Sequence, residues 1–471
     1  MTVDHPRVLL ISQDIVGETM AGPGIRYYHL ARTLARYVNV VLAVPHESSP
    51  TMSSPGFAVV RYFRQDWPSL EGQISSAEII VCPSDIASDF PQLAQSDACL
   101  VIDGYDPLLA EWLALSSRAD PETEAARWLQ RMRELNRQYV VGDYFICSSE
   151  RQRDWWLGLL EAHGRINPWT FGDDPSLRRL IDVVPFGLPE TPPQHTRPVI
   201  KGIVPGIGQR DSVILWGGGL WPWLDPLTAI QAIAEVWQTR QDVRLVLPAT
   251  AHPNPWMKGM PTLLESARSA ANRTGLVNKA IFFTQWLPYP DWTNALLESD
   301  IALSLGHDTL ETRLAFRSRV LEYIWAGLPI ITTRGDATSD LIEEYGLGIV
   351  VDYEDTPAVA GAIVRLLEAP RSARAAPFDR VRKQLSWDRV ARPLIDFCLH
   401  PHLAADRDFL GKDMGNPFHA EQTRRLMQER DHWRSLVHGY EQGRFIRLMK
   451  TLDRVKRSWR GDDREPSPPR G

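Results

Sequence analysis

The chain has 471 residues, a formal net charge of −6, a hydrophobic content of 44% and a charged content of 23%. This length predicts two domains plus extensions, and the acidic balance argues against nucleic acid as the main partner. No apolar run reaches the roughly 20 residues of a membrane-spanning helix, the N-terminus shows no secretory signal, and four scattered cysteines predict buried free thiols in a reducing cytosol.

Two series of short apolar strands alternate with helical patterns. The first-half strands are predicted at Val8–Ser12, Val38–Val44, Ala58–Tyr62, Ile79–Cys82, Leu100–Asp103, Tyr144–Cys147 and Asp182–Val184. The second-half strands are predicted at Ser212–Trp216, Val243–Leu247, Ala280–Phe283, Ile301–Leu305, Ile330–Thr333 and Ile349–Asp352. Their continuous Val, Ile and Leu runs predict parallel α/β sheets buried on both faces. Ligands of such sheets bind beyond the carboxyl ends of the strands.

The domain organisation follows from this alternation. We expect Rossmann-like domains at residues 1–190 and 206–370, joined by the Pro- and Gly-rich stretch Pro185–Pro205, then a crossover helix region at 371–400 and a helical tail at 401–471. Within the last two regions, a polar link follows Glu368. A helix is predicted around Ser386–Cys398, irregular chain at 401–417, helix again from His419 to Trp459, and disorder at Gly461–Gly471.

Glycines follow the first strand of each half. In the first half, Gly22 and Gly24 precede a helix, where the backbone can approach a ligand and the helix N-terminus favours an anion; a plain tight turn explains them equally. In the second half, Gly217, Gly218 and Gly219 are hard to justify as regular structure, since glycine costs roughly 0.5–1 kcal/mol relative to alanine there. Trp221 can stack on a sugar or base, or close a hydrophobic corner.

Two carboxylates end a first-half strand. Asp103 and Asp106 should face the predicted cleft between the two domains, where they could orient or deprotonate an acceptor hydroxyl. The alternative is a turn with an Asp cap before a helix that begins at Leu108.

Three arginines gather where a second-half helix should begin. Arg313, Arg317 and Arg319 oppose the helix dipole there, at a cost of about 0.3–1 kcal/mol each. A bound pyrophosphate would remove the conflict. The alternative is a solvated basic face paired with Glu311 and Asp308.

The tail carries an apolar stripe flanked by basic residues. Between Arg444 and Arg460 the sequence has seven basic residues and one acid, Asp453. This pattern is typical of an interfacial helix on an anionic membrane, and a partner-binding or coiled-coil helix is the competing interpretation.

The run Leu321–Ile331 (LEYIWAGLPII) resembles a characteristic segment of the retaining family four glycosyltransferases, which have the GT-B architecture. The glycine loop at Gly22–Arg26, the domain exit at Asp182–Gly187 and the turn at Gln285–Pro288 are similar to other segments of that family. Together they cover most of residues 7–400 in order. The resemblance implies two Rossmann-like domains facing across a cleft, with the acceptor in the first, the nucleotide-sugar donor in the second, and no metal or other cofactor.

The resemblance also implies roles for individual residues. Glu322 matches the second of two family glutamates and would bind the donor ribose, whereas Leu314 stands where the first belongs, so Glu311 is the candidate to replace it. The family's basic pair after the second glycine loop is absent. The expected donor-binding residues are Gly22, Gly24, Gly217, Gly218, Trp221, Leu287, Phe316, Arg317, Ser318, Arg319 and Glu322; the expected catalytic residues are Asp103, Asp106 and Glu311.

The predicted function is transfer of a sugar, a hexosyl or related group, from a nucleotide-diphosphate sugar to a hydroxyl of a glycan or lipid-linked acceptor. Cell-surface polysaccharide synthesis is the expected context, in the cytoplasm and peripherally on the inner face of the plasma membrane through residues 444–460. An epimerase of the same architecture would need an acid/base cluster that the sequence does not reveal. A non-catalytic GT-B scaffold or nucleotide-sugar-binding protein remains the main alternative.

Overall fold

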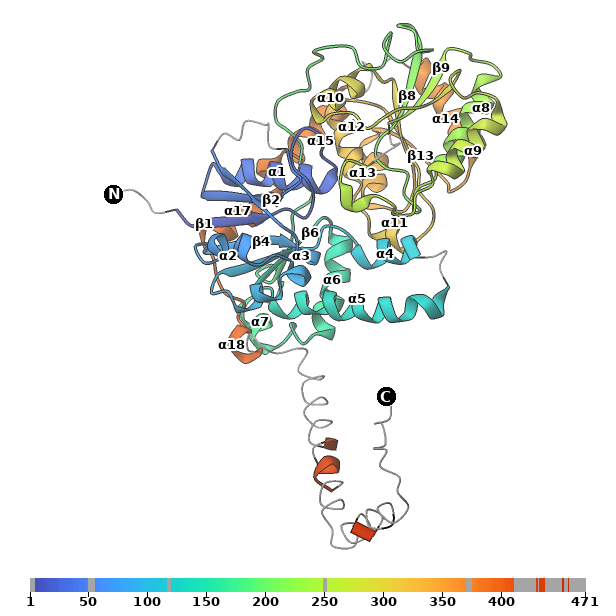
Figure 1. Cartoon of the computed structure of the whole chain (residues 1–471). Helices are drawn as coiled ribbons and strands as arrows, with labels where there is room; N and C mark the ends of the chain where they lie inside the picture. Colours follow the sequence, from blue (N-terminus) through green and yellow to red (C-terminus); the bar gives the residue numbers. More distant parts are fainter. Residues whose placement is uncertain are drawn as a thin grey trace. The chain divides into compact units, whose positions relative to one another are not determined.

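The structure is a computed structural model that describes residues 5–49, 56–116, 120–248, 252–369 and 375–410, together with 429–430, 432–436, 451–452 and 456 of the tail. Residues 1–413 form one compact unit and residues 414–471 a second. The first unit contains two sheets, each built from consecutive strands of one half of the chain (Figure 1).

The first sheet has seven strands in the order β3-β2-β1-β4-β5-β6-β7. Every recorded pairing within it is parallel. The strand order reverses between β1 and β4, which makes this edge of the sheet a natural ligand site. The strands are β1 Arg7–Ile11, β2 Asn39–Pro45, β3 Ala58–Tyr62, β4 Ile79–Pro83, β5 Cys99–Asp103, β6 Tyr144–Cys147 and β7 Ile181–Val183.

The second sheet has six strands in the order β10-β9-β8-β11-β12-β13, again with parallel pairings. Its order reverses between β8 and β11, so both sheets are doubly wound. The strands are β8 Ser212–Trp216, β9 Val243–Leu247, β10 Ile281–Phe283, β11 Ile301–Ser304, β12 Ile330–Thr333 and β13 Gly348–Val351.

Helices connect the strands on both faces of each sheet, as parallel pairing requires. Those of the first half are α1 Gly22–Leu34, α2 Pro68–Ile74, α3 Ser84–Asp89, η1 Pro91–Gln95, α4 Leu108–Ser116, α5 Pro121–Val141, α6 Glu150–Ala162 and α7 Pro168–Asp173. Those of the second half are α8 Pro226–Trp237, η2 Pro255–Met257, α9 Leu264–Thr274, α10 Tyr289–Glu298, α11 Leu310–Leu314, α12 Ser318–Ala326, α13 Ala337–Tyr345 and α14 Thr356–Glu368. The chain continues in α15 Ala375–Gln384, α16 Trp387–Val390, α17 Arg392–Leu399 and α18 Arg407–Leu410.

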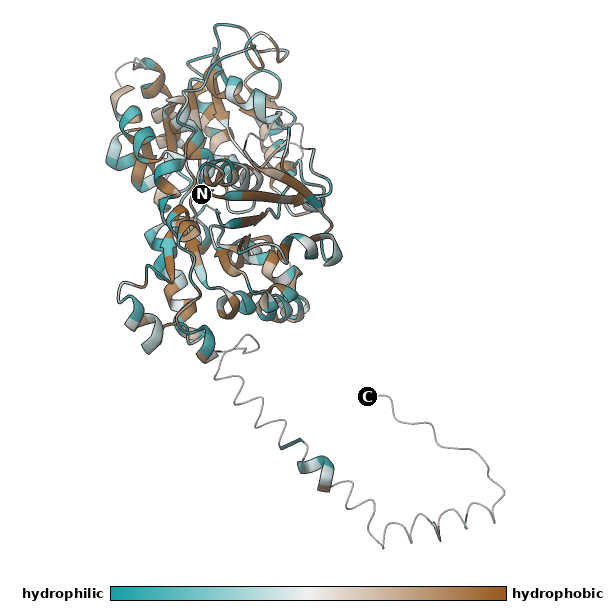
Figure 2. Ribbon diagram, turned by 90° about the vertical axis from the view of Figure 1, so that its left-hand side faces the viewer, coloured by the Kyte–Doolittle hydropathy of each residue, from teal (hydrophilic) through white to brown (hydrophobic). Residues whose placement is uncertain are grey.

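The hydrophobic core has three parts. One cluster joins residues of both halves, among them Tyr27 of α1 and Tyr323 of α12. Two further clusters cover the other faces of the second and first sheets. The strands are correspondingly hydrophobic along their length (Figure 2). Burial on both faces therefore explains the continuous apolar strands of the sequence.

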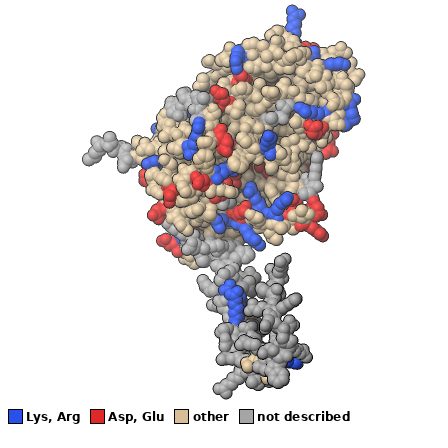
Figure 3. All heavy atoms as spheres, viewed as in Figure 1, with Lys and Arg blue, Asp and Glu red and all other residues tan. Residues whose placement is uncertain are grey.

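The predicted α/β class and GT-B architecture are confirmed, and each predicted strand is found within one residue of its predicted ends. The four cysteines are buried free thiols, as expected. On the face shown in Figure 3, basic and acidic side chains lie intermingled. Within the part of the chain that the structure describes, no helix has the length and apolar character needed to cross a membrane.

The region after Glu368 differs from the prediction. Helix α15 occupies part of the expected polar link, because Phe378 and Val381 give it a narrow apolar face that packs on α12 and α13. The expected helix around Ser386–Cys398 is two short helices, α16 and α17, and α18 lies within the range 401–417 expected to be irregular.

Most of the predicted tail helix, and the predicted disordered end at 461–471, lie outside the described residues. Within the predicted tail helix, the described residues 429–430, 432–436, 451–452 and 456 are helical.

The chain returns to the first domain through residues 385–399. Leu188 and Ser386 form an isolated parallel bridge, and the ring of Trp387 stacks on His29 of α1 at 5.4 Å. Farther on, Phe397 stacks on Tyr144 of β6 at 4.5 Å. The outgoing and returning segments therefore lie side by side, and a Cβ atom added at Gly187 would lie 2.6 Å from the Trp387 ring.

Gly187→Val tests this return crossing. We expect it to lower the free energy of unfolding by about 1–3 kcal/mol, because Trp387 must move to admit the side chain. Urea denaturation measures the change. Gly361→Ala is the matched control, since Gly361 is exposed on α14 with open space around its Cβ position and should gain about 0.5–1 kcal/mol. Equal stability of the Gly187→Val variant and the parent would contradict the crossing.

Candidate functional site

A cavity of about 580 Å³ lies between the carboxyl ends of the two sheets. Its first-domain wall comes from the loop after β1, the loop after β5 and helix α4. Its second-domain wall comes from the loop after β8, the loop after β9 and the start of α12. The volume suits a ligand of nucleotide size. The two doubly wound sheets thus direct their ligand-binding edges at one space.

Two helices begin at this cavity without a side-chain cap. Helix α1 starts at Gly22 and α12 starts at Ser318, and both residues line the cavity. A Cβ atom at Gly22 would lie 3.1 Å from the Ser318 Oγ atom, so the two N-termini meet. Uncapped N–H groups and the positive end of each helix dipole favour an anion at this point.

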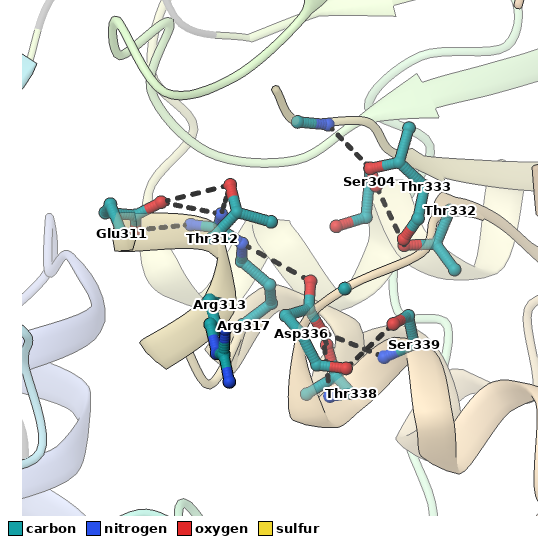
Figure 4. Close-up of polar contacts among 12 residues, drawn as sticks. Ser304, Glu311, Thr312, Arg313, Arg317, Thr332, Thr333, Asp336, Thr338 and Ser339 are labelled. Atoms are coloured by element: carbon teal, nitrogen blue, oxygen red, sulfur yellow. Dashed lines mark hydrogen bonds and ion pairs between the residues drawn. The ribbon is translucent and has the colours of Figure 1, made fainter. Parts of the chain in front are cut away.

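Arg317 is held between two buried carboxylates (Figure 4). Its Nη1 and Nη2 atoms donate to the two carboxylate oxygens of Glu311 at 2.7 and 2.8 Å. Its Nε atom lies 3.6 Å from an oxygen of Asp336, which also caps α13. Burial raises the pKa of Glu311 although Arg317 opposes the shift. The guanidinium therefore faces the cavity in one fixed orientation.

The three arginines of the cluster differ in how well they fit the two interpretations, a pyrophosphate site and a solvated basic face. Arg317 and Arg319 line the cavity, but each already has a carboxylate partner. Arg313 is exposed and does not line the cavity. Arg317 is thus paired with Glu311, as the second interpretation expects, but the pair is buried and does not form part of a solvated surface.

Arg319 is part of an aromatic cluster with Glu322. Its Nη1 atom and the Nε1 atom of Trp292 both donate to the Glu322 Oε2 atom, at 2.7 and 2.8 Å. The guanidinium lies 5.0 Å from the Trp292 ring centre and 5.6 Å from that of Trp286. Glu322 itself lines a small pocket beside the main cavity, next to His29. In this structure Glu322, the residue expected to bind the donor ribose, therefore already accepts hydrogen bonds from two protein side chains.

The second glycine loop is packed against the same helix. The Gly217 amide donates to the Tyr323 hydroxyl at 2.7 Å, and a Cβ atom there would lie 2.2 Å from that oxygen. Gly218 has a φ of +98° and faces Arg319. Close internal packing is thus one reason for these glycines, and both still line the cavity.

Aromatic side chains cover much of the second-domain wall. Trp221 and Trp223 stack on each other at 5.6 Å, and His252 lies between Trp221 and Trp286 at 5.7 and 5.3 Å. Burial lowers the pKa of His252 to about 4, with Arg319 contributing, so its ring is neutral at pH 7. This wall offers flat faces to a base or a sugar.

The structure places Asp103 outside the cavity lining. Arg26 of α1 donates to both of its carboxylate oxygens at 2.7 and 2.9 Å, and both side chains are fully buried. Arg26 also donates to the carbonyl of Val184 after β7. Asp103 therefore joins α1, β5 and the end of β7, and its expected catalytic role gives way to a structural one.

Asp106 does line the cavity, together with a carboxyl that the sequence did not single out, Glu111 on α4. Burial raises the pKa of Asp106 to about 7. Burial, Asp106 and Glu311 raise the pKa of Glu111 well above its usual range. Because α4 packs against α11, Glu111 comes from the first domain to face Glu311 of the second. Neither domain alone forms this group of carboxyls.

A loop of the second domain reaches the first-domain wall. The Asn254 Nδ2 atom donates to Asp14 at 2.5 Å, and the Trp256 ring lies 5.5 Å from the Arg64 guanidinium. All four residues line the cavity. The sequence did not indicate them, because the contact joins segments about 240 residues apart.

Some of the other expected donor-binding residues line the cavity and some do not. Phe316 and Ser318 line the cavity with Trp221. Gly24 does not line the cavity. A side chain is excluded at this position because a Cβ atom would lie 2.2 Å from the Ile15 carbonyl oxygen. Leu287 does not line the cavity and borders a small pocket beside Trp292. Leu314 is buried, with its carbonyl accepting a hydrogen bond from Gln152 of the first domain.

Among the residues that the structure describes, no three His, Cys, Asp or Glu side chains are grouped closely enough to hold a metal ion.

Comparisons with known proteins agree with this geometry. Residues 211–369 match the family model described as glycosyl transferases group 1. No curated protein matches the sequence.

Solved GT-B structures resemble the chain over most of its length. Sucrose-phosphate synthase from Thermosynechococcus elongatus has a TM-score of 0.58 at 15% identity, over 83% of this chain and 98% of that one. WaaG, a glycosyltransferase involved in lipopolysaccharide biosynthesis, has a TM-score of 0.57 at 14% identity, over 84% and 100%. Anabaena Alr3699/HepE in complex with UDP and glucose has a TM-score of 0.60 at 14% identity, over 83% and 99%. The predicted resemblance to GT-B glycosyltransferases is confirmed.

Asp103→Asn separates the structural from the catalytic interpretation. Removing one charge leaves Arg26 buried without its counterion, which should lower the free energy of unfolding by about 3–5 kcal/mol. The double variant Arg26→Met/Asp103→Leu should recover most of the loss in urea denaturation. An Asp103→Asn protein as stable as the parent would contradict the structural role.

Asp14→Asn tests the pH dependence of the domain contact. Burial raises the pKa of Asp14 to about 6, so the folded state holds this proton more tightly than the unfolded chain does. The free energy of unfolding should therefore fall as pH rises from about 4 to about 6. The variant should escape this loss and be more stable than the parent at pH 7, by up to about 3 kcal/mol. At pH 4 the two melting temperatures should be similar; a difference there as large as at pH 7 would exclude titration as the cause.

Proposed function

We propose that this chain, whose second domain matches the group 1 glycosyltransferases, moves a hexosyl or related sugar from a nucleotide-diphosphate sugar to an acceptor hydroxyl, with retention of anomeric configuration. The observation that carries the proposal is the convergence of two uncapped helix N-termini and two fixed arginines on one cavity of about 580 Å³. Such a site suits a diphosphate, which carries the charge that develops when the sugar departs.

The donor would occupy the second-domain half. Its diphosphate would lie at the start of α12 near Arg317 and Arg319, which would stabilise the leaving nucleotide diphosphate without a bound metal. Its base or sugar would lie against Trp221 or Trp286. Solved structures of HepE contain UDP and UDP-glucose, which makes uridine nucleotides the first donors to test.

The acceptor would occupy the first-domain half, opposite these groups. With a pKa near 7, Asp106 is partly ionised at neutral pH and can accept a proton from an attacking hydroxyl. Glu111 would hold its proton and act as a hydrogen-bond donor. Glu311 would supply a carboxyl group near the donor sugar, in place of the family glutamate whose position Leu314 occupies in this chain. The domain contact through Asn254 would help to exclude water, which otherwise hydrolyses the donor.

The wider context is also a proposal. A glycan or lipid-linked acceptor in cell-surface polysaccharide synthesis, on the cytoplasmic side of the membrane, would agree with the basic sequence of residues 444–460.

A second candidate function is a non-catalytic protein of the same architecture. Two observations favour it: Leu314 is buried and apolar, and the Glu322 carboxylate is occupied by Trp292 and Arg319. Such a protein would bind a nucleotide sugar without transferring it, or bind none.

A thermal-shift screen in EDTA tests the donor site. UDP, GDP, ADP, TDP and their sugars are added to the full chain, and we expect one nucleotide to raise the melting temperature. Glu322→Ala should weaken the shift, because Glu322 accepts a 2.7 Å hydrogen bond from Arg319, which lines the cavity. Arg317→Ala should weaken binding about tenfold or more, since a hydrogen bond to a charged group contributes about 1.5–3 kcal/mol. Arg313→Ala is the matched control, because that exposed arginine on the neighbouring helix α11 does not line the cavity.

The same protein distinguishes the two functions. If a nucleotide binds, Asp106→Asn should retain the shift and lose transfer to an acceptor or hydrolysis of the donor. A nucleotide shift with no turnover in the parent would support the non-catalytic function. The absence of any shift would contradict the donor site itself.

A further inference from the structure

Two aromatic rings stand exposed where the described body of the protein ends. Trp169 of α7 stacks on Phe409 of α18 with ring centres 4.1 Å apart, yet the two residues remain 46% and 53% exposed. Phe171 on the same short helix and Leu403 before α18 are also exposed. A stacked pair of large apolar side chains that stays exposed is a candidate site of interaction.

The pair is held in place by a buried ion pair. Arg165 donates to both carboxylate oxygens of Asp406 at 2.9 and 3.0 Å, and both side chains are essentially inaccessible. Asn167, which caps α7, donates to the same carboxylate at 2.8 Å. These contacts lie two to four residues from each ring. The chain therefore fixes Trp169 against Phe409 while leaving both exposed, which a loosely attached terminus would not do.

Desolvating two charges is costly, and a buried ion pair contributes little net stability compared with apolar packing. Its clearest physical effect here is to fix the backbone on both sides of the ring pair. An exposed apolar surface with a fixed geometry is suited to a partner and contributes nothing to the hydrophobic core.

The sequence that follows indicates which partner. Phe409 lies in the last described helix before residue 411, and the chain continues into a segment with seven basic residues and one acid between Arg444 and Arg460. Aromatic side chains favour the interface between water and lipid, and basic clusters favour anionic headgroups. One weak anchor gives only marginal membrane binding, whereas two act together.

We propose that the stacked pair Trp169 and Phe409 forms an aromatic patch that inserts into the interface of an anionic bilayer and acts together with the basic tail. The patch belongs to the folded body, so it would fix how the protein faces the membrane, which a tail alone cannot do. This inference does not depend on the donor or on catalysis.

Vesicle flotation of the full chain tests the proposal. Vesicles contain phosphatidylcholine with phosphatidylglycerol, or phosphatidylcholine alone. We expect binding to the anionic vesicles, and Trp169→Ser/Phe409→Ser should weaken it about tenfold or more, because both aromatic side chains lose their contact with the bilayer. His46→Ser/Phe63→Ser is the matched control, because those rings also stack, at 4.3 Å, and Phe63 is 52% exposed elsewhere on the surface.

A second measurement does not depend on a loss of binding. The four native cysteines are buried, so Phe409→Cys introduces a reactive thiol at the patch that can carry an environment-sensitive dye. We expect its emission to shift to the blue and intensify on anionic vesicles. The same dye at Phe63→Cys should not respond.

Several outcomes would overturn the proposal. Equal binding by the patch variant and the parent, with binding lost in a chain ending at Asp413, would assign lipid contact to the tail alone. Equal losses in both double variants would make the effect nonspecific. A concentration-dependent dimer that the patch variant abolishes, without vesicle binding by the parent, would assign the patch to a second copy of the chain. An unchanged melting temperature and nucleotide shift in the patch variant separate any of these results from the donor site.

Discussion

The burial of both faces of two parallel sheets is the constraint on which the rest of the structure depends. Polar groups cannot be placed along strands that are covered on both sides, so they collect in the loops at the strand ends. Parallel strands direct all their carboxyl ends to one edge, and the helices that follow begin there with their positive ends. The two sheets share one cavity at these edges. The helix N-termini, arginines, tryptophans and carboxyls of the site are therefore consequences of the sheet arrangement.

Charge balance within the cavity shapes what it can bind. Arg317 and Arg319 are close to Glu311, Glu322 and Asp336, so the arginines alone do not make the donor half strongly positive. The helix N-termini add to the attraction that the arginines exert on an anion, and a neighbouring carboxyl that holds a proton would leave its arginine less compensated. Burial raises the pKa of Glu311, so this carboxyl takes up a proton more readily than an exposed glutamate does, and its protonation would leave Arg317 with less compensation. Nucleotide binding and the protonation of this carboxyl should thus be linked.

Much of the fold could be predicted from the sequence, because each strand is a local run of apolar residues bounded by turn residues. Cavity residues could also be predicted where a short sequence motif pointed to them, as for Gly22, Arg317 and Asp106. Helix α15 was missed because its apolar face is only Phe378 and Val381 within a polar, arginine-rich stretch. Such a narrow face becomes recognisable only when its neighbours α12 and α13 are known.

Pairings between residues far apart in the sequence could not be predicted either, because no local pattern indicates them. Asp103 ends a strand beside the site, as a catalytic residue would, but Arg26 lies 77 residues away and neutralises it in the core. Glu111 and Asn254 enter the cavity only because the two domains come together. Local sequence shows that a charged residue ends a strand, whereas its partner decides whether the charge stabilises the fold or faces a ligand.

The energetic character of the cavity favours a working site over an inert scaffold. Asp14, Asp106, Glu111 and Glu311 all have raised pKa values caused mainly by burial. Each such carboxyl lowers the stability of the ionised protein, and apolar residues of similar size would remove that cost. A scaffold that binds nothing would gain no benefit from several of these groups around one cavity. In an enzyme a carboxyl such as Asp106, whose pKa burial raises to about 7, can exchange a proton near neutral pH, which makes that cost part of the chemistry.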